Sequence, residues 1–250
     1  MRSYVTFLWG GARAYRPEHV NVLAHALKYW DADAKFICVT DQTGFSPLVE
    51  TFPMPKEAEA LGALGAPQGK DFPSSYRRLW CFSEAATALG ERIMLFDIDA
   101  MVVGPVRDLW DTEGDFVGWR PLSIWGREDR IGGGTWMLRT GTVSCIWERF
   151  IQDPQKLIDD TRAKGWNGSD QAIMSRFLKS YPTWPQFCGI YGSQDGVLEW
   201  ELPPEGAKIV HFNGAEKAWR HQSKAWIRAY YEHFAKPPEY DVRGLRIASG

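Results

Sequence analysis

The chain has 250 residues, of which 44% are hydrophobic and 24% charged, and its formal net charge is −2. This length and balance suffice for the core of one large globular domain. The near-neutral charge argues against a nucleic-acid partner, and no stretch is long enough for a transmembrane segment. The N-terminal apolar run is too short for a signal peptide, and the four cysteines form no CxxC pair. We therefore expect a cytoplasmic protein with reduced thiols.

Predicted strands and helices alternate along the first half of the chain. The helix over residues 17–30 begins with Pro17 in its first turn and carries apolar side chains at helical spacing. Such alternation predicts an α/β fold with a mostly parallel central sheet and helices on both faces. No internal repeat or clear linker is present, so we expect a single domain over residues 1–250. In chain order, we expect strands at 4–9, 35–40, 93–96, 115–119, 135–138 and 208–212, helices at 17–30, Ser74 or Ser75 to 89, 142–151, 169–179 and 222–234, and a surface loop at 53–73.

Two aspartates interrupt the most apolar strand. Asp97 and Asp99 follow the run Ile93 to Phe96, and a second apolar run continues after them. Unpaired buried carboxylates are costly, and residues two apart on an extended chain point to the same side. The pair is therefore a candidate for holding one divalent metal ion, although two aspartates that cap a turn would give the same pattern.

A second polar group ends a later predicted strand. His211 is followed by Gly214 and Lys217 at intervals of three residues. Glycine allows a ligand to approach the backbone closely, and lysine supplies a positive charge for a phosphate. Two carboxylates and an imidazole suit Mn²⁺ better than Mg²⁺, which is the alternative ion. A buried structural histidine is the simpler interpretation of His211 when it is taken alone.

Two further segments carry polar side chains. Ser169 is typical of a helix N-cap, and Asp170 after it favours the positive end of the helix dipole, so a purely structural role is also possible here. Arg77 and Arg78 precede the aspartate strand on a predicted helix. Adjacent helical positions point about 100° apart, so we expect one arginine to face the site and the other to be a solvated surface charge.

These pieces, in this order, resemble glycosyltransferase family 8, which uses nucleotide-sugar donors and has the Rossmann-like GT-A fold. The resemblance spans nearly the whole chain. It rests on Arg78-Leu79, Asp97-Ile-Asp99, Gly132-Gly-Gly134, Asp170-Gln171, and His211-Phe-Asn-Gly214 with Lys217 and Trp219.

The resemblance implies a role for each matched residue. It implies that Asp97, Asp99 and His211 hold Mn²⁺, and that Asp170 and Gln171 are catalytic and lie beside the anomeric carbon of the donor sugar. It further implies a nucleotide-binding half over residues 1–110, an acceptor-binding and metal-completing half over 111–235, and a tail over 236–250. The donor-binding residues that it implies are Thr6, Trp9, Arg78, Asp97, Ile98, Asp99, Gly133, Gly214 and Lys217.

Two positions depart from the family pattern. The family's asparagine that touches the donor sugar is Gly132 here, and its acidic or amide residue after the first strand is replaced by Leu8-Trp-Gly-Gly11. Trp9 could stack on the base in place of that residue. The expected reaction is transfer of a hexose, with retention of configuration, from a nucleotide-sugar that we expect to be UDP-linked. The acceptor is a glycan, a lipid-linked glycan or a protein.

Two alternatives remain open at this stage. A phosphatase of the haloacid-dehalogenase type would use Asp97 as its nucleophile, with Asp159 and Asp160 as a later acidic pair. A catalytically degenerate nucleotide-sugar-binding protein would keep the fold without turnover, and Gly132 makes this possible.

Overall fold

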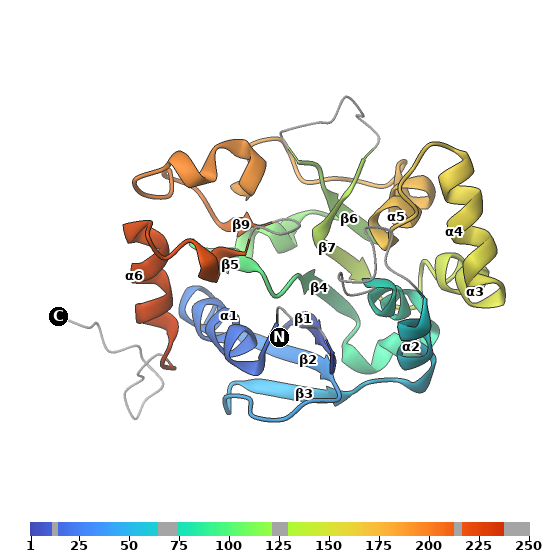
Figure 1. Ribbon diagram of the computed structural model, residues 1–250, viewed down its shortest axis with the longest axis horizontal. Helices are drawn as coiled ribbons and strands as arrows, with labels where there is room; N and C mark the ends of the chain where they lie inside the picture. Colours follow the sequence, from blue (N-terminus) through green and yellow to red (C-terminus); the bar gives the residue numbers. More distant parts are fainter. Residues whose placement is uncertain (12–14, 65–74, 122–129, 213–216, 238–250) are drawn as a thin grey trace.

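A six-stranded sheet forms the centre of the computed structural model, which describes residues 1–11, 15–64, 75–121, 130–212 and 217–237 (Figure 1). Four neighbouring strands run parallel, and β7 lies antiparallel between β4 and β6. The predicted α/β fold with a mostly parallel sheet is therefore confirmed. The strand order is β3 (Val49–Pro53), β2 (Ala34–Thr40), β1 (Arg2–Leu8), β4 (Arg92–Phe96), β7 (Gly132–Arg139) and β6 (Phe116–Trp119).

The inner strands are buried on both faces. In β1, Tyr4 and Leu8 belong to one hydrophobic cluster, while Val5 and Phe7 belong to a second cluster on the other side of the sheet. Successive side chains of a strand point to opposite faces, so this division explains why β1 is apolar throughout rather than alternating.

A second, three-stranded sheet was not predicted. It consists of β5 (Ala100–Val102), β9 (Ile209–His211) and β8 (Ile190–Gly192). The apolar run after Asp99 is therefore not a continuation of β4. The chain turns at Asp97, whose carbonyl accepts a hydrogen bond from the Ala100 N–H at 3.0 Å, and then joins the second sheet.

Helices cover both faces of the central sheet (Figure 1). On one side, α1 packs Val20, Leu23 and Leu27 into the first cluster, beside the C-terminal helix. The helices are α1 (Pro17–Trp30), α2 (Lys56–Ala60), α3 (Cys145–Gln152), α4 (Pro154–Ala163), α5 (Asp170–Leu178) and α6 (Ala225–Phe234), with 3₁₀ segments η1 (Leu61–Ala63), η2 (Ser75–Phe82), η3 (Glu84–Leu89), η4 (Arg107–Asp111), η5 (Ser193–Asp195), η6 (Val197–Glu199) and η7 (Ala218–Arg220).

Three local expectations differ from the structure. The helix expected up to residue 89 is two 3₁₀ segments, because Ser83 between η2 and η3 has an extended backbone. Part of the loop expected at 53–73 contains α2 and η1, and β3 precedes it. A separate helix, α4, starts where Pro154 follows Asp153, whose side chain accepts a hydrogen bond from the Lys156 N–H. Asp153 thus ends α3 and caps α4.

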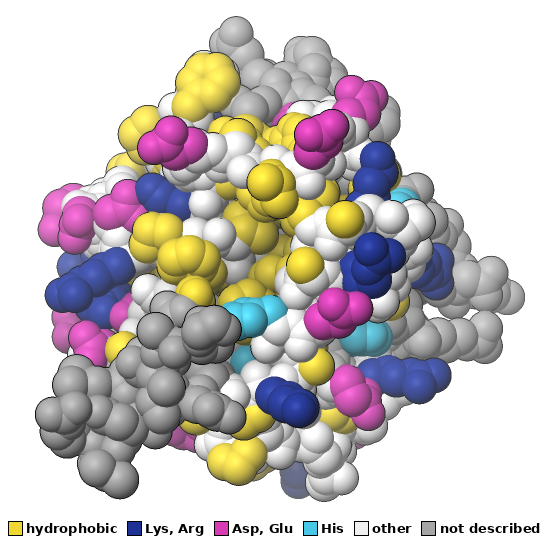
Figure 2. Space-filling view, turned by 90° about the vertical axis from the view of Figure 1, so that its left-hand side faces the viewer, with side chains coloured by type: hydrophobic (Ala, Val, Ile, Leu, Met, Phe, Trp, Pro, Cys, Tyr) yellow, Lys and Arg dark blue, Asp and Glu magenta, His cyan; other side chains and the backbone are white. Residues whose placement is uncertain are grey.

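The molecular surface agrees with the near-zero net charge. On the face shown in Figure 2, basic and acidic side chains are interspersed, and neither sign covers a large area. No helix in the described part of the chain has the length and apolar character needed to cross a membrane.

Candidate functional site

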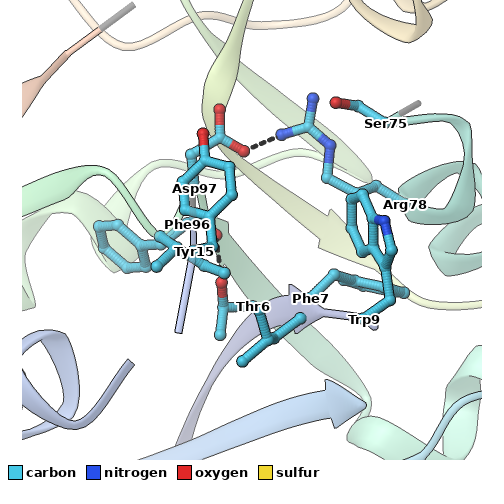
Figure 3. A pocket seen from close by; sticks show the side chains of 10 residues that line it. Thr6, Phe7, Trp9, Tyr15, Ser75, Arg78, Phe96 and Asp97 are labelled. Atoms are coloured by element: carbon cyan, nitrogen blue, oxygen red, sulfur yellow. Dashed lines mark hydrogen bonds and ion pairs between the residues drawn. The ribbon is translucent and has the colours of Figure 1, made fainter. Parts of the chain in front are cut away.

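A pocket lies at the carboxyl ends of β1 and β4 (Figure 3). These strands are neighbours in the sheet. The chain leads from β1 to β2 on one side, whereas from β4 it passes through β5 of the second sheet and returns as β6 at the opposite edge. Such a switch point is where open α/β sheets bind ligands. The described residues that line the pocket are Thr6, Phe7, Leu8, Trp9, Tyr15, Ser75, Arg78, Phe96, Asp97 and Ile98.

Arg78 connects the two parts of the predicted site. Its guanidinium donates to Asp97 and, through two nitrogens, to Asp170, with Nε 3.0 Å from the Asp170 carboxylate. It also donates to the Gly133 carbonyl at 3.1 Å. Arg78 and Asp170 are buried, and the two nearby carboxylates outweigh burial, so the pKa of Arg78 is raised. The structure therefore places Arg78, Asp97, Asp170 and Gly133 together.

Asp97 is the more accessible aspartate of the pair, with 35% of its side chain exposed. Partial burial raises its pKa to about 6; Arg78 opposes this shift, and the charges of Asp99 and Asp170 add to it. A carboxylate in this position gains from any further cation that comes close.

Asp99 is held in a different set of contacts. The Lys217 ammonium lies 2.5 Å from Asp99 Oδ2, and the Tyr15 hydroxyl donates to the same oxygen at 3.0 Å. Lys217 also donates to the Tyr15 hydroxyl oxygen at 2.7 Å. Burial and the nearby Asp99 and Asp97 carboxylates raise the pKa of Tyr15 well above its usual value, so the phenol keeps its proton. Sequence reasoning missed Tyr15, because nothing marks an isolated tyrosine ahead of a helix as a site residue.

His211 is buried beside Asp99 in the second sheet, where its strand pairs with Ala100. Its Nε2 lies 2.8 Å from the Thr135 hydroxyl, while Nδ1 has no hydrogen-bond partner among the described residues. Burial lowers the pKa of His211 to about 4, so the imidazole is neutral near pH 7. A neutral imidazole with a free ring nitrogen is the form that binds metals.

Gly134 makes room for this ring. A Cβ at position 134 would lie 2.7 Å from His211 Nδ1, closer than such atoms come in proteins. The last glycine of the predicted motif is thus required by the position of the histidine.

The donor set fits a divalent ion of borderline softness, because two carboxylates and one neutral imidazole are available. In this structure, the carboxylates are instead held by the cations Arg78 and Lys217. Within the described ranges, no three His, Cys, Asp or Glu side chains are gathered as a metal-binding group.

The other two glycines of the motif also face large side chains. A Cβ at Gly132 would lie 2.9 Å from Trp119 Cζ3, so the Trp119 ring occupies the space that a side chain at position 132 would need. A Cβ at Gly133 would lie 3.2 Å from Gln171 Cβ and 3.4 Å from an Arg78 nitrogen. The glycine that replaces the family's asparagine at position 132 thus leaves space that the Trp119 ring of the neighbouring strand fills.

At the end of β1, Trp9 lines the pocket across from Asp97 (Figure 3). Thr6 is fully buried, and its hydroxyl donates to the Phe96 carbonyl at 2.9 Å, which ties β1 to β4. Arg77 lies with its guanidinium carbon 4.8 Å from the centre of the Trp9 ring. It is half-buried, so the expectation of a solvated surface charge is wrong.

Three residues that the sequence suggested for the site are not among the described residues that line the pocket. Gly214 lies outside the described residues. Asp159 and Asp160 are exposed on α4 and form ion pairs with Arg162 and Lys156 of the same helix. The acidic pair that the phosphatase alternative requires is thus engaged within its own helix.

Comparison with models of known protein families gives no match, and neither does comparison with curated proteins. Solved structures, however, match over most of the chain. Galactosyltransferase LgtC, in complex with donor and acceptor sugar analogues, is similar with a TM-score of 0.61 and 15% identity, over 93% of this chain and 94% of LgtC.

Two other glycosyltransferases are also similar. GlyE of Streptococcus pneumoniae matches with a TM-score of 0.56 and 17% identity, over 94% of this chain and 60% of its own. Mouse xyloside xylosyltransferase 1 matches with a TM-score of 0.52 and 13% identity, over 85% of this chain and 97% of its own. The molecule therefore has the GT-A fold of these enzymes, and the resemblance to glycosyltransferase family 8 is confirmed at the level of the fold.

Proposed function

We propose that this protein is a retaining, metal-dependent glycosyltransferase that transfers a hexose from a nucleotide-sugar, with a UDP-sugar as the first donor to test. One observation carries the proposal: at the switch point of a GT-A sheet Arg78 contacts Asp97, and next to it Lys217 contacts Asp99, with the neutral His211 buried beside Asp99 in the second sheet. The similarity to LgtC, whose structure holds donor and acceptor sugar analogues, supports this class of substrate.

The charges of the site suit a leaving diphosphate. Lys217 and Arg78 are buried cations, and each already contacts an anionic oxygen that a phosphate oxygen could replace. A divalent ion held by Asp97, Asp99 and His211 would supply further positive charge to the diphosphate. Manganese is the ion that this donor set favours. Preorganised positive charge of this kind is the main electrostatic contribution to departure of the leaving group.

Retention with attack on the same face of the sugar fits the position of Asp170. Arg78 holds one oxygen of this carboxylate through two nitrogens, and the side chain starts α5 at the positive end of the helix. Both effects stabilise the carboxylate and weaken it as a nucleophile. In the proposed step, the bond between the anomeric carbon and the diphosphate breaks, and the acceptor oxygen bonds to the same face. The acceptor proton moves to a leaving phosphate oxygen.

Gln171 follows Asp170 on α5 and approaches Gly133, so we propose that its amide contacts the sugar in the reaction. The structure of an LgtC active-site mutant, in which a glutamine is replaced by glutamate, is similar with a TM-score of 0.62 and supports a role for an active-site glutamine. We further propose a glycan, lipid-linked glycan or protein as the acceptor. The free, buried thiols Cys38 and Cys81 support a reducing, cytoplasmic location.

Turnover tests the proposal directly. The protein is incubated with Mn²⁺ and either UDP-glucose or UDP-galactose, and proton NMR follows the anomer that is released or transferred. We expect the α-anomer as the first product and loss of turnover in Asp99→Asn. Release of the β-anomer would contradict retention, and an absence of turnover with every donor would favour the degenerate binding protein.

A further inference from the structure

Arg77 is a half-buried cation that the proposed reaction does not use. Its Nε is buried without a hydrogen-bond partner, and no described carboxylate lies within ion-pair distance of its guanidinium. The guanidinium carbon lies 4.8 Å from the centre of the Trp9 ring, and Asp41 and Glu59 are the acidic groups whose charges reach it without forming an ion pair. Burial lowers the pKa of Arg77 even though the charges of Asp41 and Glu59 oppose the shift, so a half-buried guanidinium that forms no ion pair is costly here.

The guanidinium fits closely between two parts of the chain. Besides the Trp9 ring it meets Gly62 in η1, where a Cβ would lie 2.7 Å from Arg77 Cζ. Gly62 therefore leaves the space that the flat guanidinium fills. The contacts with Gly62 and with the Trp9 ring together restrict the Arg77 side chain.

Trp9 itself borders the donor pocket. The ring stands across the pocket from Asp97 and Tyr15 (Figure 3), and Phe7 and Leu8 of the same strand also line the pocket. Arg77 is not one of the described lining residues, although its guanidinium lies over the Trp9 ring.

We propose that Arg77 is a positioning residue for the nucleotide base: it backs Trp9 and holds the ring as a stacking platform. This inference rests on the proposed function. A ring held in one orientation before binding loses less conformational entropy when a base stacks on it. Stacking on an aromatic ring tolerates different bases, because every base has a π face.

Two probes separate the platform from the phosphate site. Calorimetry in the presence of Mn²⁺ measures binding of UDP, GDP and ADP, which carry a base, and of inorganic pyrophosphate, which carries none. The variants are Arg77→Met, Arg77→Lys and Trp9→Ala. Arg149→Met is the matched control. Arg149 is an exposed arginine of α3 that also lies over an aromatic ring, 5.4 Å from the centre of Phe177.

We expect Arg77→Met to weaken nucleotide binding about fivefold to tenfold, from the lost cation–π contact and the freed ring. Trp9→Ala should weaken nucleotide binding more, and Arg77→Lys, which keeps the charge but not the flat group, should be intermediate. Pyrophosphate binding should change less than about twofold in all three variants. Arg149→Met should leave both probes unchanged.

Equal weakening of pyrophosphate and nucleotide by Arg77→Met would overturn the inference, because the effect would then be general. Unchanged nucleotide affinity in Arg77→Met and Trp9→Ala would also overturn it, while leaving the proposed function intact. Failure of the unaltered protein to bind any of the four probes would instead remove the donor site, and with it both proposals.

Discussion

Replacing Arg78 by methionine would remove the cation that holds the two acidic parts of the site together. The Arg78 side chain is 9% exposed, and its partners Asp170 and Asp97 are 6% and 35% exposed. Methionine has a similar length and no charge. The variant would therefore leave one deeply buried carboxylate and one half-buried carboxylate without their common partner.

Removal of one partner of a buried ion pair costs about 3–5 kcal/mol. We expect the lower end, about 3 kcal/mol, because water still reaches Asp97 and can compensate in part. For a domain of this size, that corresponds to a fall in melting temperature of about 6–12 °C.

The assay is thermal unfolding of the wild type, Arg78→Met, and the double variant Arg78→Met with Asp170→Asn. The double variant removes the stranded buried charge, so it should regain part of the lost stability. A single variant that melts within about 1 °C of the wild type would refute the reasoning, because the ion pair would then contribute little net stability. A double variant less stable than the single one would show that the buried charge is not the source of the cost.

Three further predictions concern the surroundings of the site. Gly134→Ala should displace the His211 ring and weaken Mn²⁺-dependent UDP binding at least about tenfold, measured by calorimetry. Unchanged binding would contradict the role of Gly134 in making room for a metal-binding histidine. Burial lowers the pKa of His19 from 6.5 to about 4. As the pH decreases from about 6.5 toward 4, His19 therefore takes up a proton in the unfolded state before it does so in the folded state, and the free energy of unfolding should fall. His19→Gln should flatten that part of the curve of melting temperature against pH, and an unaltered slope would assign it to another group. Ser169→Ala should cost about 1 kcal/mol, a decrease of about 2–4 °C in melting temperature, because the Ser169 hydroxyl caps α5; no change would mean that the cap is dispensable.

The positions of the main polar residues could be predicted from the sequence because they interrupt apolar runs. Asp97, Asp99 and His211 stand next to apolar runs that a buried strand explains. The α/β sheet places Asp97 at the end of β4, whereas His211 reaches Asp99 through the unpredicted pairing of β9 with β5. The α1 boundaries at Pro17 and Trp30 were likewise predictable from Pro17 and the helical spacing.

Contacts between distant segments could not be predicted in this way. The second sheet depends on pairing of β5 with β9, more than a hundred residues later, and a short apolar run does not reveal its partner. Tyr15 reaches Asp99 and Lys217 only because the fold brings its loop to them. The relation of Gly132 to Trp119 is also invisible in sequence, since it is a packing of two neighbouring strands.

Metal-dependent nucleotide binding tests the central claim most directly. Calorimetric titration of UDP, with and without Mn²⁺, into the wild type and Asp99→Asn gives four binding curves. The account predicts tight binding only for the wild type with Mn²⁺, since Asp99 is both a proposed metal ligand and the partner of Lys217. UDP binding that is equal with and without Mn²⁺, and unchanged in Asp99→Asn, would contradict a metal-dependent donor site at the ends of β1 and β4.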